Sequence, residues 1–114
     1  MAKRAAKPKI LHIPIKREYF DAIRSGDKKE EYRAYTPFWE SRLRAKDEKG
    51  EYTQFRHYDI VRFRNGYEPD SPVMEVEFKE TIVERFVDAP EDADISERYG
   101  FAIVLGEVIG VENI

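Results

Sequence analysis

The sequence contains no cysteine and only two histidines, His12 and His57. The absence of cysteine excludes disulfide bonds, thiol nucleophiles and zinc sites with thiolate ligands. It is also typical of a reducing compartment, so we expect a cytoplasmic protein. Two histidines are too few for a histidine-rich metal site, and we expect neither a metal nor another cofactor. No apolar run approaches the roughly 20 residues of a membrane-spanning helix, so we expect no membrane association.

The charged residues that are present, 38% of the chain, are distributed unevenly. Residues 1–69 contain 17 lysines and arginines against 11 aspartates and glutamates, a net charge of +6, whereas residues 70–114 contain 3 against 12, a net charge of −9. A basic half attracts phosphate groups, and an acidic half discourages indiscriminate binding to nucleic acid. The alternative interpretation is an ordinary surface on which the charges happen to be uneven.

Periodicity and capping signals predict a strand-dominated α+β fold, and 114 residues suit one domain. We expect a flexible basic arm at residues 1–9 and a single domain at 10–114. Alternating or β-branched segments indicate strands at 10–16, 28–35, 58–66, 73–87 and 101–114. Helices are expected at 17–26, at 36–43 and briefly around Ile95, and the polar stretch Arg44–Phe55 is expected to be a loop. Short, glycine-bearing strands favour a small β-barrel of about five to six strands flanked by two to three helices.

The charged stretch SGDKKEEYRAYTPFW raises the question of whether it forms a solvated surface or a pocket. Period-two geometry predicts two faces for its strand. One face would carry Lys29, Glu31, Arg33 and Tyr35, and the other Glu30, Tyr32 and Ala34. We expect Tyr32 and Ala34, the less polar set, to point into the core. A carboxylate and a guanidinium on the opposite face can hydrogen-bond a planar heterocycle or a phosphate.

The segment GDKKEEYR matches the pattern G-x-K-x-x-E-x-R at Gly26, Lys28, Glu31 and Arg33. It resembles the signature of ASCH domains, members of the PUA-like superfamily related to a domain of activating signal cointegrator 1. The stretches ILHIPIKREYFDAI, YDIVRFRNG and FAIVLGEVIGVENI resemble other parts of the family, although Tyr58 stands where glycine is usual.

The resemblance implies a β-barrel with a cleft at the motif and a role in recognising RNA or modified bases. Small bacterial relatives deacetylate N4-acetylcytidine, and others are described as ribonucleases; a bacterial or phage source is implied. In the amidohydrolase branch a lysine, a threonine and a distal glutamate carry the chemistry. Lys28 matches the lysine, Glu31 occupies the threonine position, and Glu91 and Glu97 are the candidates for the distal glutamate.

Three hypotheses follow. The first is a module that binds RNA or a modified nucleoside. Its candidate ligand contacts are Gly26, Lys28, Lys29, Glu31, Arg33, Tyr35, Trp39, Arg62 and Arg64. The second is a small hydrolase in which Lys28 and Glu31 are catalytic. The third is a partner-docking protein with no nucleic-acid role.

Each of these side chains also has an ordinary structural interpretation. Trp39 can pack against its own helix instead of stacking on a base. Arg62 and Arg64 can lie on a solvated sheet face. His12, inside an apolar strand, is expected to be a hydrogen-bonded structural histidine rather than an acid or a base.

Overall fold

The computed structural model describes residues 7–114, so that residues 1–6 of the expected basic arm lie outside the described residues. The chain divides into two compact units. The first unit contains Met1–Lys28, Tyr58–Phe78 and Gly106–Ile114, and the second contains Lys29–His57 and Lys79–Leu105.

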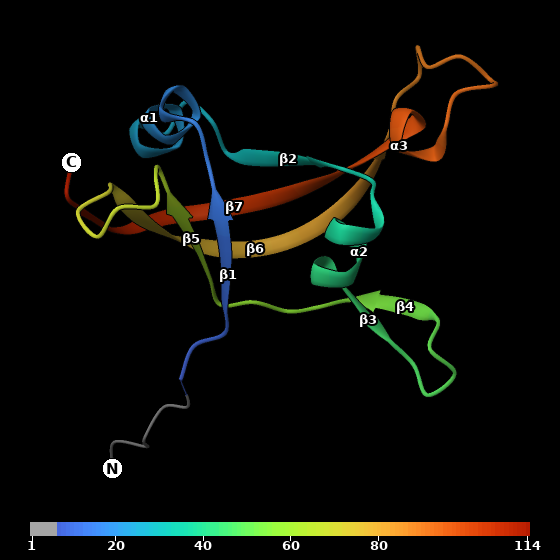
Figure 1. The fold of residues 1–114 in the computed structure, drawn as a ribbon, viewed down its shortest axis with the longest axis horizontal. Helices are drawn as coiled ribbons and strands as arrows, with labels where there is room; N and C mark the ends of the chain where they lie inside the picture. Colours follow the sequence, from blue (N-terminus) through green and yellow to red (C-terminus); the bar gives the residue numbers. More distant parts are fainter. Residues whose placement is uncertain (1–6) are drawn as a thin grey trace. The chain divides into compact units, whose positions relative to one another are not determined.

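The strand-dominated α+β class expected from the sequence is confirmed, with seven strands and three short helices among residues 7–114 (Figure 1). The strands are β1 (Ile10–Pro14), β2 (Glu30–Ala34), β3 (Arg44–Lys46), β4 (Tyr52–Phe55), β5 (Ile60–Arg64), β6 (Val73–Arg85) and β7 (Tyr99–Glu112). The helices are α1 (Arg17–Ser25), α2 (Pro37–Leu43) and α3 (Ile95–Arg98). Five strands follow one another in one sheet in the order β1-β5-β6-β7-β2, and β3 and β4 form a two-stranded sheet.

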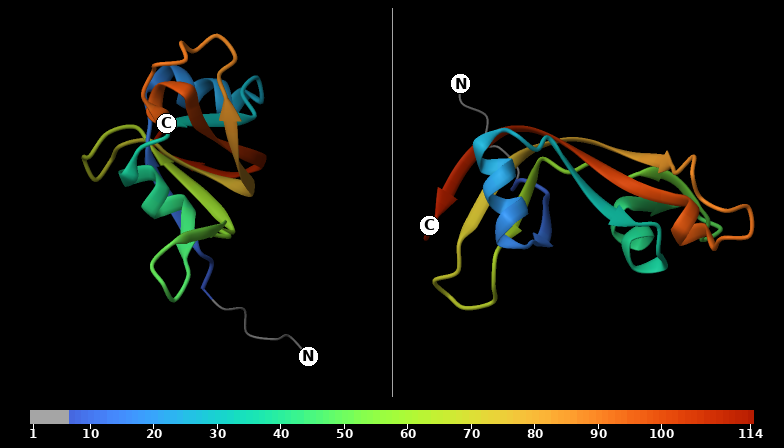
Figure 2. Two further views of the ribbon diagram at one scale, coloured as in Figure 1. Left: turned by 90° about the vertical axis from the view of Figure 1, so that its right-hand side faces the viewer. Right: turned by 90° about the horizontal axis from the view of Figure 1, so that it is seen from above.

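In the first unit, β1 pairs in parallel with β5, and β5 pairs antiparallel with β6. Val61 and Phe63 are fully buried, while Arg62 and Arg64 are partly exposed, as the alternation of this strand predicts. The β5–β6 loop, residues 65–72, projects from the strands in both views of Figure 2.

Helix α1 closes the core of the first unit with Phe20 and Ile23, both buried. It ends at Gly26, whose φ of 89° is left-handed and whose N–H donates to the carbonyl of Ile23. Glycine adopts this conformation without steric cost, so the expected C-terminal cap is confirmed.

In the second unit, β2 pairs antiparallel with β7, and Arg33 lies opposite Phe101. Helix α2 begins at the expected signal: the Thr36 hydroxyl accepts a hydrogen bond from the Trp39 N–H, and Pro37 occupies the first turn. The buried apolar side chains come from α2 and β7. They are Leu43, Phe101, Ala102, Ile103 and Leu105.

The expectation that Arg44–Phe55 is a loop is wrong, because β3 and β4 form a hairpin there. Asp47 organises its turn by accepting hydrogen bonds from the N–H groups of Lys49 and Glu51, at 2.9 and 3.0 Å. Cation–π contacts also link the two strands, since the Arg44 guanidinium lies 5.2 Å from the centroid of the Phe55 ring. The charged residues that suggested a loop therefore stabilise the strand pair.

The expectation that Tyr32 and Ala34 point into the core is also wrong. Tyr32 is 49% exposed and Ala34 is exposed, whereas Glu31 is only 3% exposed. The alternation itself is correct, but the buried residue is the polar one. A carboxylate can be buried at this position because Arg33 forms an ion pair with it.

Thr81 on β6 is buried, and its hydroxyl has no hydrogen-bond partner among residues 7–114. A buried unsatisfied hydroxyl destabilises a protein, and an apolar group of the same shape does not. We therefore expect Thr81→Val to raise the free energy of unfolding by about 1 kcal/mol, measured by urea denaturation. Thr81→Ser, which keeps the hydroxyl and loses the methyl group, is expected to lower it. A loss of stability in Thr81→Val would show that the hydroxyl makes a favourable interaction.

Candidate functional site

The four residues of the G-x-K-x-x-E-x-R motif are divided between the two units. Gly26 and Lys28 belong to the first unit, and Glu31 and Arg33 to the second. Gly26 acts as the cap of α1, and the Lys28 ammonium lies 5.4 Å from the centroid of the Tyr19 ring. A shared cleft for all four residues stays a prediction.

Glu31 and Arg33 form a tight pair on β2. The Arg33 Nη1 atom donates to the Glu31 Oε2 atom at 2.5 Å and to the Tyr32 carbonyl at 2.9 Å. The Tyr32 N–H donates in turn to Glu31 Oε1 at 3.2 Å. Both backbone polar groups of Tyr32 are thus bound by its neighbours' side chains. The expectation that Glu31 and Arg33 share a face of the strand is confirmed.

Arg33 is held from a second direction by Trp39, since its guanidinium carbon lies 5.2 Å from the centroid of that ring. Trp39 also contacts Phe38 edge to face, with centroids 5.3 Å apart. The indole therefore packs within the second unit. It fixes the orientation of the arginine. Because Trp39 is the only tryptophan of the chain, its fluorescence reports on the surroundings of Arg33.

Tyr35, another predicted ligand contact, packs within the second unit. Its ring stacks on Phe101 with centroids 4.6 Å apart. Its hydroxyl accepts a hydrogen bond from Arg44 at 3.2 Å and donates one to Glu40 at 3.1 Å. These contacts explain its partial burial without a ligand.

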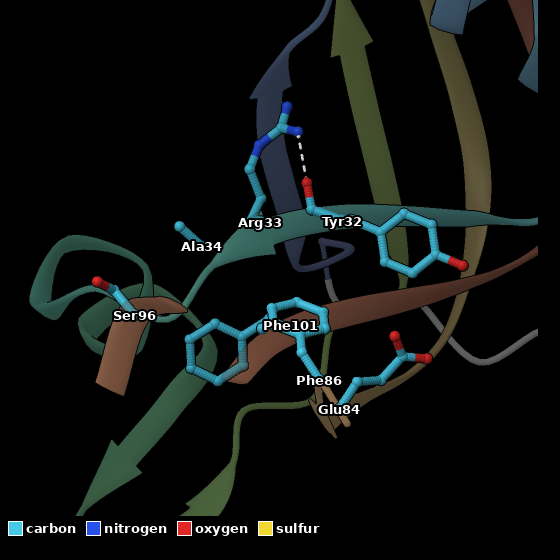
Figure 3. Close-up of a pocket in the computed structure, with 8 residues that line it drawn as sticks. Tyr32, Arg33, Ala34, Glu84, Phe86, Ser96 and Phe101 are labelled. Atoms are coloured by element: carbon cyan, nitrogen blue, oxygen red, sulfur yellow. Dashed lines mark hydrogen bonds between the residues drawn. The ribbon is translucent and has the colours of Figure 1, made fainter. Parts of the chain in front are cut away.

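A pocket of about 510 Å³ opens in the second unit beside β2. It is lined by residues of β2, of the end of β6 and the position after it, of α3 and of the start of β7: Tyr32, Arg33, Ala34, Glu84, Phe86, Ser96, Gly100 and Phe101. Figure 3 shows the rings of Phe86 and Phe101 near each other, and the Arg33 guanidinium directed away from them. The pocket walls are thus aromatic and its polar groups few, which is the usual composition of a small-molecule site.

Tyr32 brings a phenol to this pocket. Its hydroxyl donates to the Glu30 carboxylate at 3.0 Å. This hydrogen bond, followed by partial burial and the negative charges of Glu30 and Glu84, raises the pKa of Tyr32 above its usual value. The phenol therefore stays protonated at neutral pH and acts as a hydrogen-bonding group.

A second pocket, of about 460 Å³, lies in the first unit between β1, β5 and the loop that follows β5. Arg62 and Arg64, two of the predicted ligand contacts, line it together with His12, Ile13, Pro14 and Tyr67. The expectation that His12 is a hydrogen-bonded structural histidine is wrong. Its side chain is exposed and makes no hydrogen bond with any residue between 7 and 114.

The remaining predicted residues are not part of either pocket. Lys29 is exposed, and its carbonyl accepts a hydrogen bond from the Leu105 N–H at 3.0 Å. Glu91 and Glu97, the candidates for a distal glutamate, are both exposed. Between residues 7 and 114, no cluster of three or more His, Asp or Glu side chains is suited to a metal ion. No helix of that part of the chain has the length and apolar character needed to cross a membrane.

Sequence reasoning missed most of the pocket in the second unit, above all Phe86, Ser96, Glu84 and Tyr32. Phe86 and Ser96 flank an acidic stretch with no periodic signal, so nothing local indicated that they meet β2. For Tyr32, the alternation and polarity of its strand predict the core. The one signal in the sequence is a glycine at position 100, since glycine in a strand often marks a close approach of another segment. In the structure an added Cβ at Gly100 would lie 2.8 Å from the Phe86 ring.

No protein-family model, curated protein or solved structure matches the chain.

Proposed function

We propose that this protein binds RNA or a modified nucleoside, and that the pocket of the second unit holds the base. The observation that carries the proposal is the pocket itself. It measures about 510 Å³, it has phenylalanine and tyrosine side chains in its walls, and Arg33 belongs to its lining. A pocket of this size and character accepts a ligand as large as a nucleoside. The proposal agrees with the role that the resemblance to ASCH domains implies.

The aromatic side chains would supply most of the affinity. Base–aromatic stacking contributes about 1–3 kcal/mol per base and does not depend on base identity. Phe86 is suited to stacking because it is 46% exposed, so its ring is accessible from solvent. Tyr32 offers a second exposed ring from β2.

The polar groups of the pocket would select the base. Glu84 offers carboxylate oxygens, which accept hydrogen bonds from an exocyclic amine such as cytosine N4. Ser96 adds a hydroxyl that both donates and accepts. This pair favours a base that presents an amine beside an acceptor, as cytosine and its N4-modified forms do.

Arg33 would act outside the stack. Its guanidinium is held by Glu31, the Tyr32 carbonyl and the Trp39 ring. An arginine that is already ordered loses little entropy when it binds a phosphate or a ribose. We therefore assign it the backbone of the nucleotide whose base lies in the pocket.

The proposal is tested by titrating the protein with cytidine, N4-acetylcytidine and a short single-stranded RNA while following the fluorescence of Trp39. Phe86→Ala is expected to weaken binding at least about fivefold, the lower limit for one lost stacking contact. Val87→Ala is the matched control, because Val87 is the next residue, is 89% exposed and does not line the pocket. The control is expected to bind like the wild type.

Three results would contradict the proposal. Equal affinity in Phe86→Ala and Val87→Ala would exclude this pocket as the base site. Chromatography of the same mixtures would detect any conversion of N4-acetylcytidine to cytidine. Such conversion would favour the hydrolase with Lys28 and Glu31 as catalytic residues. If no nucleoside or RNA binds at all, the partner-docking hypothesis replaces both.

A further inference from the structure

We infer that the first unit contains a separate phosphate site, formed by His12, Arg62 and Arg64, which binds a nucleotide whose base stacks on Tyr67. The site is the pocket of about 460 Å³ beside β1 and β5. It shares no residue with the pocket of the proposed function. The inference therefore stands or falls independently of that function.

The parallel pairing of β1 with β5 brings the basic groups together. In this register His12 lies opposite Arg62, and Pro14 lies opposite Arg64. All four side chains line the same pocket. Because proline has no N–H and a rigid ring, Pro14 gives that part of the pocket an inflexible apolar wall.

Arg64 is the central cation. Its Nε atom donates to the Gly66 carbonyl at 3.0 Å, and its Nη2 atom donates to the Glu68 carbonyl at 2.6 Å. These acceptors are uncharged, and among residues 7–114 no carboxylate forms an ion pair with Arg64. Its positive charge is therefore fixed in position but not neutralised, a favourable state for binding an anion.

Arg62 and His12 would complete the site. Arg62 is shared with the Glu75 carboxylate on β6, but the atoms are 3.7 Å apart and both side chains are about one-third exposed. Such a pair is weak and can exchange one partner for a phosphate. The imidazole of His12 offers an N–H donor that no residue between 7 and 114 occupies.

Tyr67 indicates the class of ligand. Its side chain is 85% exposed, although it lines the pocket, so its ring is almost entirely free of protein packing. An exposed aromatic ring beside two arginines is the combination with which proteins bind nucleotides, by stacking on the base and by charge on the phosphate. A neighbouring hollow that Lys16 also lines shares Arg64 and Tyr67, and it adds another cation near the same ring.

The experiment is an NMR titration of ¹⁵N-labelled full-length protein with inorganic phosphate, with adenosine 5′-monophosphate and with adenosine. We expect shifts in residues of β1, β5 and the β5–β6 loop with both phosphate ligands. Arg64→Gln is expected to weaken both about tenfold or more, since it removes charge-assisted hydrogen bonds. Tyr67→Ala is expected to weaken the nucleotide about fivefold and to leave inorganic phosphate unchanged.

Arg24→Gln is the matched control, because it removes the same charge from an exposed residue of α1 that lines neither pocket. Equal phosphate affinity in Arg64→Gln and Arg24→Gln would overturn the inference. If Arg64→Gln also changes the spectrum of the β5–β6 loop, the phosphate affinity of Arg62→Gln is compared with that of Arg24→Gln instead. Arg62 is suited to this test because it pairs with Glu75 on β6 and not with that loop. Adenosine that binds at Tyr67 as tightly as the monophosphate would likewise exclude a phosphate site.

Discussion

Replacing Arg33 with alanine is expected to lower the free energy of unfolding by about 3 kcal/mol, because it leaves the buried Glu31 carboxylate without the guanidinium that forms an ion pair with it. Glu31 is only 3% exposed, and the 2.5 Å hydrogen bond from Arg33 is charge-assisted. Removing one partner of a buried ion pair is far more costly than removing both, since the remaining carboxylate loses its charge-assisted hydrogen bond in a medium of low dielectric. Urea denaturation of the wild type and the variant gives the difference directly.

A double-mutant cycle separates this electrostatic effect from the loss of packing against Trp39. Glu31→Gln keeps the shape of the side chain and removes its charge. In that background Arg33→Ala is expected to lower the free energy of unfolding by only about 1 kcal/mol, the usual contribution of a neutral hydrogen bond. An equal loss in both backgrounds would mean that Arg33 stabilises the protein through its contact with Trp39 and not through the carboxylate.

Phe101→Ala is expected to cause the largest loss of stability, about 3–5 kcal/mol, the range for removing a buried phenylalanine side chain. Phe101 is fully buried, stacks on Tyr35 and meets Phe55 edge to face with centroids 6.3 Å apart. The truncation would remove both ring contacts and leave a cavity between β7, β4 and the segment after β2. Thermal and urea unfolding measure the effect, and Phe101→Leu is expected to recover much of it.

Phe86→Ala is the comparison for this prediction, because both phenylalanines line the same pocket but Phe86 is about half exposed. We expect it to lower the free energy of unfolding by only about 1–1.5 kcal/mol, since about half of its apolar surface is already in contact with water. The two variants thus distinguish Phe101, which stabilises the fold, from Phe86, whose ring is available to a ligand. Similar losses in both variants would contradict this division.

Local features of the fold could be predicted because they depend on a few neighbouring residues. Gly26 as a C-cap, Thr36 as an N-cap and the alternation of Val61 and Phe63 follow from backbone geometry alone. Each is found where the sequence indicates it. The resemblance of residues 26–33 to the ASCH signature stays a prediction, as does the cleft that it implies.

The buried face of β2 could not be predicted from polarity. Composition assigned Tyr32 to the core and Glu31 to the surface, and the structure has the reverse. The outcome depends on Arg33, because a paired carboxylate can be buried where a lone one cannot. The hairpin at Arg44–Phe55 was missed for a similar reason, since its stability comes from contacts between the strands.

By itself, the sequence determined the fold class and most of the helix and strand positions. It also showed that many charged residues lie close together in the segment 25–39. Only the tertiary structure decided which side chains form the two pockets. Gly100 meets β2 through the antiparallel pairing of β7 with β2, and Phe86 and Ser96 line the same pocket from segments outside that pair. His12 meets Arg62 through the parallel pairing of β1 with β5. Such pairings join residues that are distant along the chain, and the free energy that fixes them comes from packing and hydrogen bonding across strands, which no local pattern records.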